Sequence, residues 1–328
     1  MRLAICVTTL IGSLLSALGS GFICLCYLLL PLKPHFRHRL IQSLAIADFL
    51  NATSNAASGI YILARDRELP EGIACRMNGL VTQITVQATD LSILAIAIVT
   101  VWVVTNPGTF GAWSTRKAVL AVCFIWVLPF ITGFTALGKD WYHPVSGNWC
   151  WIQKKPVYLR YALTHGWRFF VIISVIVMYT YLHFFLRSHY KELRDAAGDL
   201  HADAGALTVD LSNSHSADEK YENDENDKRK THTQKPSHRD PDYGGEVKKV
   251  FLMRAYPFFY VILLIPGIAN RMVEASGRSS KVTQLLQAST QFVGLANAIT
   301  YGWNEKILGE LRERFGRRPK PSPGSHIV

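Results

Sequence analysis

The sequence predicts an all-α membrane protein, a seven-transmembrane helix bundle with a short amphipathic helix after the last span. Hydrophobic segments long enough to cross about 30 Å of hydrocarbon recur along the 328-residue chain, and each crossing needs roughly 20 residues. The first of these segments carries no charged side chain. The predicted spans are residues 3–32, 40–64, 77–105, 118–138, 158–186, 250–270 and 282–303. A helical bundle embedded in a bilayer is the architecture that this pattern indicates.

The first span has an alternative interpretation as a cleaved signal peptide. Small residues at positions 16–20 follow an apolar run, as they do before a signal cleavage site. The hydrophobic run continues for about a dozen residues past that point, which is too long for the apolar core of a signal peptide. We therefore expect residues 3–32 to form a transmembrane helix.

The distribution of basic residues predicts how the chain is oriented. Near the membrane, the connections after spans one, three and five and the tail hold 17 Lys and Arg residues, against 10 in the other connections. Cytoplasmic loops are enriched in Lys and Arg, so we expect the N-terminus outside and the C-terminus in the cytoplasm. The net charge of +11 is explained by basic residues that flank the spans, near anionic lipid headgroups. The sequence has no zinc or RNA-binding pattern that would indicate a nucleic acid partner. The expected location is the lipid bilayer of the plasma membrane.

The hydrophobic pattern divides the chain into four parts. They are residues 1–188 with helices one to five, 189–247, 248–303 with helices six and seven, and 304–328. The second part has 14 acidic and 8 basic residues and little apolar surface, so we expect a disordered cytoplasmic third inner loop. Its Ser and Thr residues suggest a regulated tether, and an inert linker is the equal alternative. An apolar stripe over residues 304–315, followed by basic residues, predicts an amphipathic helix and a basic tail on the inner leaflet.

No enzyme signature is present. The sequence lacks the HExxH, GxSxG, phosphate-loop and CxxC patterns that indicate metal, hydrolase, nucleotide or redox chemistry. A retinal-binding protein needs a lysine inside its last helix, whereas Lys281 and Lys306 flank that span. We therefore expect no catalytic activity, no metal and no cofactor.

Two cysteines lie outside the predicted spans. Cys75 precedes span three, and Cys150 lies in the connection before span five. A disulfide between them would hold that connection over the mouth of the bundle and close a long chain loop. Free thiols are the alternative, which an oxidising extracellular side disfavours.

Two acids and one amide lie inside the predicted spans at similar depth. At 1.5 Å per residue, Asp48 is about 12 Å from the cytoplasmic end of its helix, and Asp90 is about 22 Å below Cys75. Asn297 lies at a comparable depth below Lys281. Ionisable groups within a bilayer are costly and often functional, so we expect Asp48, Asp90 and Asn297 to form a polar conformational switch. A static interhelical hydrogen bond is the alternative.

The start of span five predicts a ligand site in the outer half of the bundle. Arg160, Thr164 and Arg168 are spaced by four residues and share one face of a regular helix. Two guanidinium groups on one face suit an anionic ligand such as a carboxylate or phosphate. The equal alternative is that Arg168 pairs with Asp90. With polar groups of spans three and seven added, the candidate ligand-binding residues are Arg160, Thr164, His165, Arg168, Gln83, Gln87, Gln284 and Gln287.

Three segments carry a family resemblance. They are residues 43–49 (SLAIADF), 147–152 (GNWCWI) and 294–304 (GLANAITYGWN). Together they resemble the cyclic-AMP-receptor-like G-protein-coupled receptor family of slime moulds and fungi. The resemblance covers all seven helices and implies a heterotrimeric G protein as partner, coupled through the inner loops and the tail. It also matches Cys75 and Cys150 to the outer disulfide of that family.

The residues and the resemblance together give one leading functional hypothesis. We expect a receptor that senses an extracellular small molecule and activates a heterotrimeric G protein to control cAMP-type signalling. The ligand candidates are anionic, cyclic-nucleotide-like or nutrient-like molecules. One alternative is a small proton-coupled secondary transporter that uses Asp48 and Asp90, although transporters usually show internal repeats. The other alternative is an accessory membrane protein without a ligand.

Overall fold

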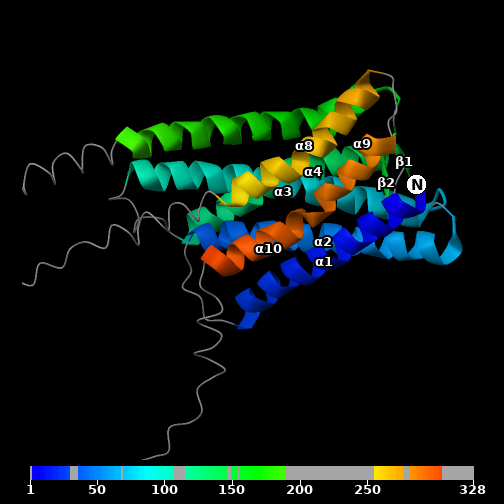
Figure 1. The fold of residues 1–328 in the computed structure, drawn as a ribbon, viewed down its shortest axis with the longest axis horizontal. Coiled ribbons are helices and arrows are strands. Elements are labelled where there is room, and N and C mark those ends of the chain that lie inside the picture. Colours follow the sequence, from blue (N-terminus) through cyan, green and yellow to red (C-terminus); the bar gives the residue numbers. More distant parts are fainter. Residues whose placement is uncertain are drawn as a thin grey trace, which may run out of the picture. The chain divides into compact units, whose positions relative to one another are not determined.

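The computed structural model describes residues 2–29, 36–67, 69–106, 115–145, 149–153, 155–188, 255–276 and 281–304. Seven helical segments follow one another within these ranges (Figure 1). The first four are α1 (Arg2–Leu29), α2 (Phe36–Arg65), α3 (Ile73–Thr105) and α4 (Thr115–Gly138). The fifth covers Tyr158–Ser188 and begins with α5 (Tyr158–Arg160) and the π-helical turn η2 (Tyr161–His165). The sixth is α8 (Ala255–Ala275), and the seventh joins α9 (Lys281–Leu286), the 3₁₀ segment η3 (Gln287–Phe292) and α10 (Val293–Asn304).

The predicted seven-helix bundle is confirmed, and its spans match the observed helices closely. The sixth helix is the main difference, because it continues to Ala275, five residues past the predicted end at 270. The extra turn holds Arg271 and Glu274, whose side chains pair at 2.6 Å. Hydropathy counts both charges against a span, although a close pair costs much less than two separate charges. The predicted loop 189–247 and the helix and tail after residue 304 lie outside the described residues.

The outer surfaces of the helices are apolar, as contact with lipid requires. Among the described residues, four helices are long and apolar enough to cross a membrane, namely Leu3–Leu29, Ile73–Thr105, Arg116–Gly138 and Tyr158–Ser188. Large apolar side chains such as Leu18, Phe124 and Ile173 are more than half exposed. In water such a surface would aggregate. The chain is therefore a multi-pass membrane protein.

The chain divides into two compact units, Met1–Tyr179 with Val247–Val328, and Thr180–Glu246. In the first unit, α1 packs against α2 and α10, α2 against α3, and α3 against α4. The buried side chains of Ile93, Tyr260 and Tyr301 belong to its core. In the second unit, the described residues are the last turns of the fifth helix, where the rings of Tyr181 and Phe185 stack at 6.2 Å.

Helix α1 lies unusually close to the seventh helix. A Cβ placed on Gly12 would lie 2.9 Å from the Cβ of Gln291, and one placed on Gly19 would lie 2.9 Å from the Cβ of Ala298. Both distances are shorter than real Cβ contacts. Small residues permit such an approach of two membrane helices, so the contact between α1 and the seventh helix depends on the absence of side chains.

A short hairpin packs on α3 at the end of the bundle that carries Cys75. Its strands are β1 (Tyr142–Pro144) and β2 (Cys150–Ile152), which run antiparallel with Tyr142 opposite Ile152. The Tyr142 hydroxyl donates a hydrogen bond of 3.0 Å to the carbonyl of Gly133 in α4. Burial raises the pKa of Tyr142 above its usual value, so this hydroxyl stays protonated and continues to donate.

Candidate ligand cavity

The expected disulfide between Cys75 and Cys150 is formed, with the two Cα atoms 5.3 Å apart. A second link reinforces it, because the backbone N–H of Cys150 donates to Oδ1 of Asn78 at 2.8 Å. Nδ2 of Asn78 in turn donates to Oγ of Ser54 in α2 at 2.9 Å. Strand β2 is thereby fixed to α3 and α2. We call this end of the bundle the disulfide end.

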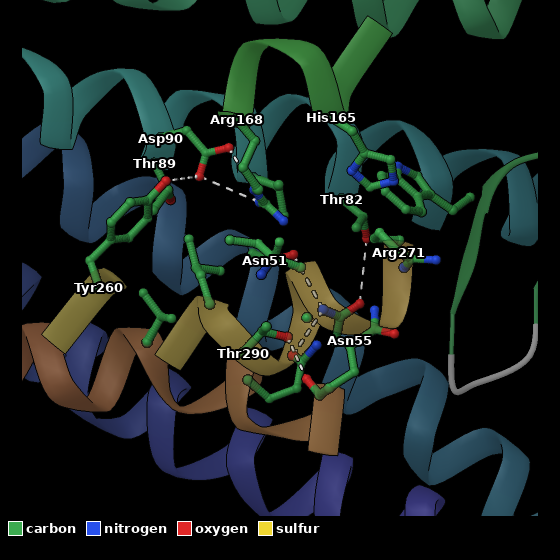
Figure 2. Close-up of a pocket in the computed structure, with 18 of the residues that line it drawn as sticks. Asn51, Asn55, Thr82, Thr89, Asp90, His165, Arg168, Tyr260, Arg271 and Thr290 are labelled. Atoms are coloured by element: carbon green, nitrogen blue, oxygen red, sulfur yellow. Dashed lines mark hydrogen bonds and ion pairs between the residues drawn. The ribbon is translucent and has the colours of Figure 1, made fainter. Parts of the chain in front are cut away.

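A polar cavity lies among the helices and extends toward the hairpin. Its volume is about 90 Å³. One water needs about 10–15 Å³ on this scale, so the cavity holds several waters or one small polar molecule. The polar residues that line it are Asp48, Asn51, Asn55, Thr82, Thr89, Asp90, His165, Arg168, Tyr260, Arg271, Gln287, Thr290 and Gln291. Figure 2 shows Asp90 and Tyr260 on one side of the cavity and His165 and Arg271 on the other.

Asp90 is the centre of an ion pair that joins three helices beside the cavity. Nε of Arg168 donates to its Oδ2 at 2.9 Å, and Nη2 of Arg168 lies 3.4 Å from Oδ1. The Tyr260 hydroxyl donates to the same Oδ1 at 2.7 Å. These side chains come from α3, the fifth helix and α8. The pairing of Arg168 with Asp90, one of the two alternatives predicted from the sequence, is thus the arrangement present.

Asp48 is the centre of a second polar group. It accepts a hydrogen bond of 2.9 Å from Oγ1 of Thr89 and one of 2.7 Å from Nδ2 of Asn297. The structure therefore brings Asp48 and Asn297 together, as expected, and connects α2, α3 and α10. Asp90 is bonded to Arg168 and Tyr260 instead of to Asp48 or Asn297. Both carboxylates line the same cavity.

Three of the eight candidate ligand-binding residues line the cavity, namely His165, Arg168 and Gln287. Gln83 instead supports the hairpin, because its Oε1 accepts from Nε1 of Trp151 at 3.0 Å and from Oγ1 of Thr164 at 2.7 Å. The side-chain carbonyl of Gln87 accepts from Thr132 in α4. Gln284 in α9 is not among the lining residues.

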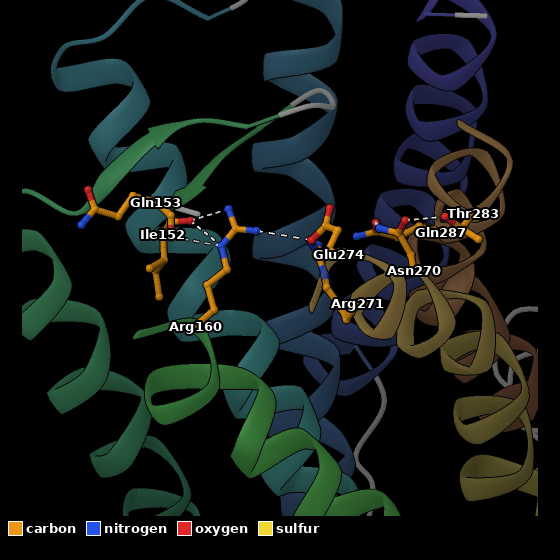
Figure 3. A network of polar contacts seen from close by, with 8 residues as sticks. All are labelled: Ile152, Gln153, Arg160, Asn270, Arg271, Glu274, Thr283 and Gln287. Carbon is orange, nitrogen blue, oxygen red and sulfur yellow. Dashed lines mark hydrogen bonds and ion pairs between the residues drawn. The ribbon is translucent and has the colours of Figure 1, made fainter. Parts of the chain in front are cut away.

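Arg160 holds the hairpin rather than facing the cavity. Its Nε and Nη2 donate to the carbonyl of Ile152 at 2.8 and 2.6 Å, and its Nη1 lies 3.5 Å from Glu274 (Figure 3). The expectation of one regular helical face through Arg160 and Arg168 was wrong, because residues 161–165 form a π turn between them. Each guanidinium group already has an internal partner. An anion at both arginines would have to replace those partners.

Several cavity residues were not predicted from the sequence. Asn51 and Asn55 follow Asp48 at helical spacing, so a polar face of α2 was readable from the sequence. Asn55 donates to Oε1 of Gln291 at 3.3 Å. Arg271 was assigned to a connection because the predicted sixth span ended at residue 270.

The seventh helix is irregular where it meets the cavity, and Ser16 of α1 completes its backbone hydrogen bonding. The Ser16 hydroxyl donates to the carbonyl of Gln291 at 2.5 Å and accepts from the N–H of Leu295 at 3.1 Å. In a regular α-helix these two backbone groups would bond to each other. The hydroxyl is therefore inserted into the ladder, at the end of the 3₁₀ segment Gln287–Phe292.

Ser16→Ala should destabilise the protein by about 1–3 kcal/mol, because it leaves a buried carbonyl and N–H without a partner. Ser20→Ala is the matched control, since Ser20 is also buried but, among the described residues, only donates to the Ser16 carbonyl of its own helix. Its expected cost is below about 0.5 kcal/mol. Thermal denaturation of the purified protein in lipid nanodiscs measures both. Equal losses for the two variants would contradict the inserted-hydroxyl interpretation.

Similarity to known proteins shows the fold of this chain and the family to which it belongs. Squid rhodopsin has the same fold, with a TM-score of 0.68 and 13% sequence identity, over 96% of this chain and 85% of that chain. At this identity the likeness shows the fold alone, that of a seven-helix membrane bundle. The chain belongs to the Git3 family, whose model, described as a G protein-coupled glucose receptor regulating Gpa2, matches residues 2–193.

Two relatives come from the fungus Arthrobotrys oligospora. Ascaroside receptor GPR3 is 26% identical over 93% of this chain and 86% of that protein. Ascaroside receptor GPR2 is 30% identical over 55% of this chain and 44% of that protein. The expectations of a fungal G-protein-coupled receptor family and of no enzymatic activity are confirmed. The narrower cyclic-AMP-receptor-like label stays a prediction.

Proposed function

We propose that this protein is a plasma-membrane receptor that binds a small polar molecule in the cavity and activates a heterotrimeric G protein. Its disulfide end faces the outside, and its C-terminus lies in the cytoplasm. Membership of the Git3 family supports the G protein as partner. The distribution of Lys and Arg supports the orientation. Control of cAMP-type signalling by that G protein is part of the proposal, and residues 189–247 are its proposed cytoplasmic tether.

One observation carries the proposal: the cavity that receives the ligand is lined by the same side chains that hold three helices together. Asp90, Arg168 and Tyr260 line the cavity and link α3, the fifth helix and α8. A ligand that hydrogen-bonds to any of them competes with an interhelical contact. Its binding therefore favours a different arrangement of these helices, which is the differential interaction that a population shift requires.

The side chains that line the cavity also bear on the transporter alternative and on the choice of ligand. Asp90 is already paired with Arg168 at 2.9 Å, so it is not a free carboxyl group for proton transport. Four amide side chains line the cavity. Each can both donate a hydrogen bond to a neutral polar group and accept one from it. Glucose, named for the family, and ascarosides, named for the relatives, are therefore the first ligands to test beside cyclic nucleotides.

The test is guanine-nucleotide exchange by a fungal Gα subunit in reconstituted membranes containing the receptor. We expect at least one of glucose, an ascaroside or cyclic AMP to accelerate exchange above the ligand-free rate. Membranes without receptor are the control for spontaneous exchange. If none of these ligands changes the rate with any Gα of the same fungus, the proposed function is wrong.

A further inference from the structure

Two arginines share one glutamate at the disulfide end of the cavity. Nη1 of Arg271 lies 2.6 Å from Oε2 of Glu274, and Nη1 of Arg160 lies 3.5 Å from the same oxygen. The side chains of Arg271, Arg160 and Glu274 are 12, 6 and 21% exposed. Among the described residues, Asp90 is paired with Arg168, and Asp48 is hydrogen-bonded to Thr89 and Asn297. Arg160 and Arg271 therefore share a single carboxylate within ion-pair distance, and a buried charge without a partner of its own is costly.

Arg271 is the member of this pair that faces the cavity. Arg160 does not line it, and its donors point to the carbonyls of Ile152 and Gln153. Arg271 does line it and lies 5.0 Å over the ring of Trp151. Within the described structure only its Nη1 has a hydrogen-bond partner. The remaining N–H groups of Arg271 are available to a ligand.

His165 supplies a second unused group beside Arg271. The side chain is 3% exposed and packs edge-on against Trp151, with the ring centroids 5.1 Å apart. Its Nε2 is buried and lacks a hydrogen-bond partner among the described residues. It lines the cavity on the same side as Arg271 (Figure 2). A buried polar atom without a partner is unfavourable, and a ligand oxygen would remove that cost by accepting from Nε2–H, the donor of the tautomer that carries its proton on Nε2.

We propose that Arg271 and His165 form a subsite for an anionic oxygen group of the ligand, a carboxylate or a phosphate. This inference rests on the proposed ligand cavity and goes beyond it, because it names the charge of the ligand. Arg271, rather than Arg160 or Arg168, is then the arginine that contacts the anionic group. The amides of Asn51, Asn55 and Gln287 then face the neutral polar part of the ligand.

The test compares probes of similar shape that differ in charge, on the purified full-length receptor in nanodiscs. Glucose is the neutral probe, glucuronate carries a carboxylate, glucose 6-phosphate carries a phosphate, and inorganic phosphate is the charged group alone. Thermal stabilisation as a function of probe concentration gives an apparent affinity for each. We expect the better of the charged sugars to bind roughly ten-fold more tightly than glucose, or more. The two charged sugars distinguish the two kinds of anionic group.

Charge variants provide the structural control. Arg271→Gln should remove the preference for the charged sugar, and Glu274→Gln should increase it, because it removes the negative charge that competes with the ligand. Arg76→Gln is the matched control, since Arg76 is about half exposed and pairs with Asp140 at 2.9 Å outside the cavity. Its preference should stay at the wild-type value. The opposite signs of Arg271→Gln and Glu274→Gln exclude a general loss of folding as the explanation.

Several results would overturn the subsite. They are equal affinities for glucose and both charged sugars, no stabilisation by any charged probe, or an unchanged preference in Arg271→Gln. The outcome is separate from that of the proposed function. Anion binding without nucleotide exchange would retain the subsite and reject the receptor role, whereas exchange driven by neutral glucose alone would do the reverse.

Discussion

Asp90→Asn should destabilise the protein by about 3–5 kcal/mol, the usual cost of removing one partner from a buried ion pair. The substitution keeps the shape of the side chain but leaves the Arg168 guanidinium without its counter-charge. The amide also accepts less strongly from Tyr260, which now donates to Oδ1 at 2.7 Å. A lower midpoint of thermal denaturation in nanodiscs, relative to the wild type, measures the loss.

The double variant Asp90→Asn/Arg168→Gln distinguishes an unpaired charge from a general packing defect. It removes both charges, so it should recover a large part of the stability that Asp90→Asn loses. Asp48→Asn is a second comparison, because the partners of Asp48 are the neutral Thr89 and Asn297. It leaves no cation unpaired and should cost less than Asp90→Asn. Additive losses in the double variant would show that the ion pair does not account for the effect.

Cys75→Ser should have the second large effect, on stability and on ligand binding together. The disulfide closes a chain loop of 75 residues, and the chain-entropy model gives about 4.5 kcal/mol for a loop of that size. The helices remain formed in the unfolded state of a membrane protein, so this figure is an upper value. The loss reaches the cavity because β2 carries Trp151, which contacts both His165 and Arg271.

Cys123→Ser is the matched control for the disulfide. Cys123 is a free and exposed cysteine of α4, so the same substitution there should change neither the denaturation midpoint nor probe binding. Reductant should lower the midpoint of the wild type and leave that of Cys75→Ser unchanged. A Cys75→Ser protein that keeps both wild-type stability and binding would contradict the supporting role of the hairpin.

The class of fold was predictable because hydrocarbon thickness sets the length of each span, and hydropathy reports that length directly. The approximate depth of buried polar residues was also predictable, because the rise per residue is constant along a regular α-helix. This is why Asp48 and Asn297 were correctly brought together. Depth does not give the rotation of a helix about its axis. Asp90 therefore bonds to Arg168 and Tyr260, while Asp48 bonds to Asn297.

The roles of Arg160 and Arg271 could be assigned only from the structure. Arg160 binds the carbonyls of β2, and the position of a hairpin backbone leaves no pattern in side-chain spacing. The π turn at Tyr161–His165 also breaks the four-residue periodicity on which the shared face depended. Arg271 was not predicted to line the cavity because its charge ended the predicted sixth span. Its pairing with Glu274 allows the helix to continue through this charged turn.

The most direct test of the receptor account is ligand-dependent nucleotide exchange on two glutamine variants of the seventh helix. Gln287 lines the cavity and accepts from Nδ2 of Asn270 at 2.6 Å, whereas Gln284, one turn earlier, does not line it. We predict that Gln287→Ala shifts the ligand concentration for half-maximal exchange upward and that Gln284→Ala leaves it at the wild-type value. Equal responses of both variants and the wild type would contradict a ligand site in this cavity.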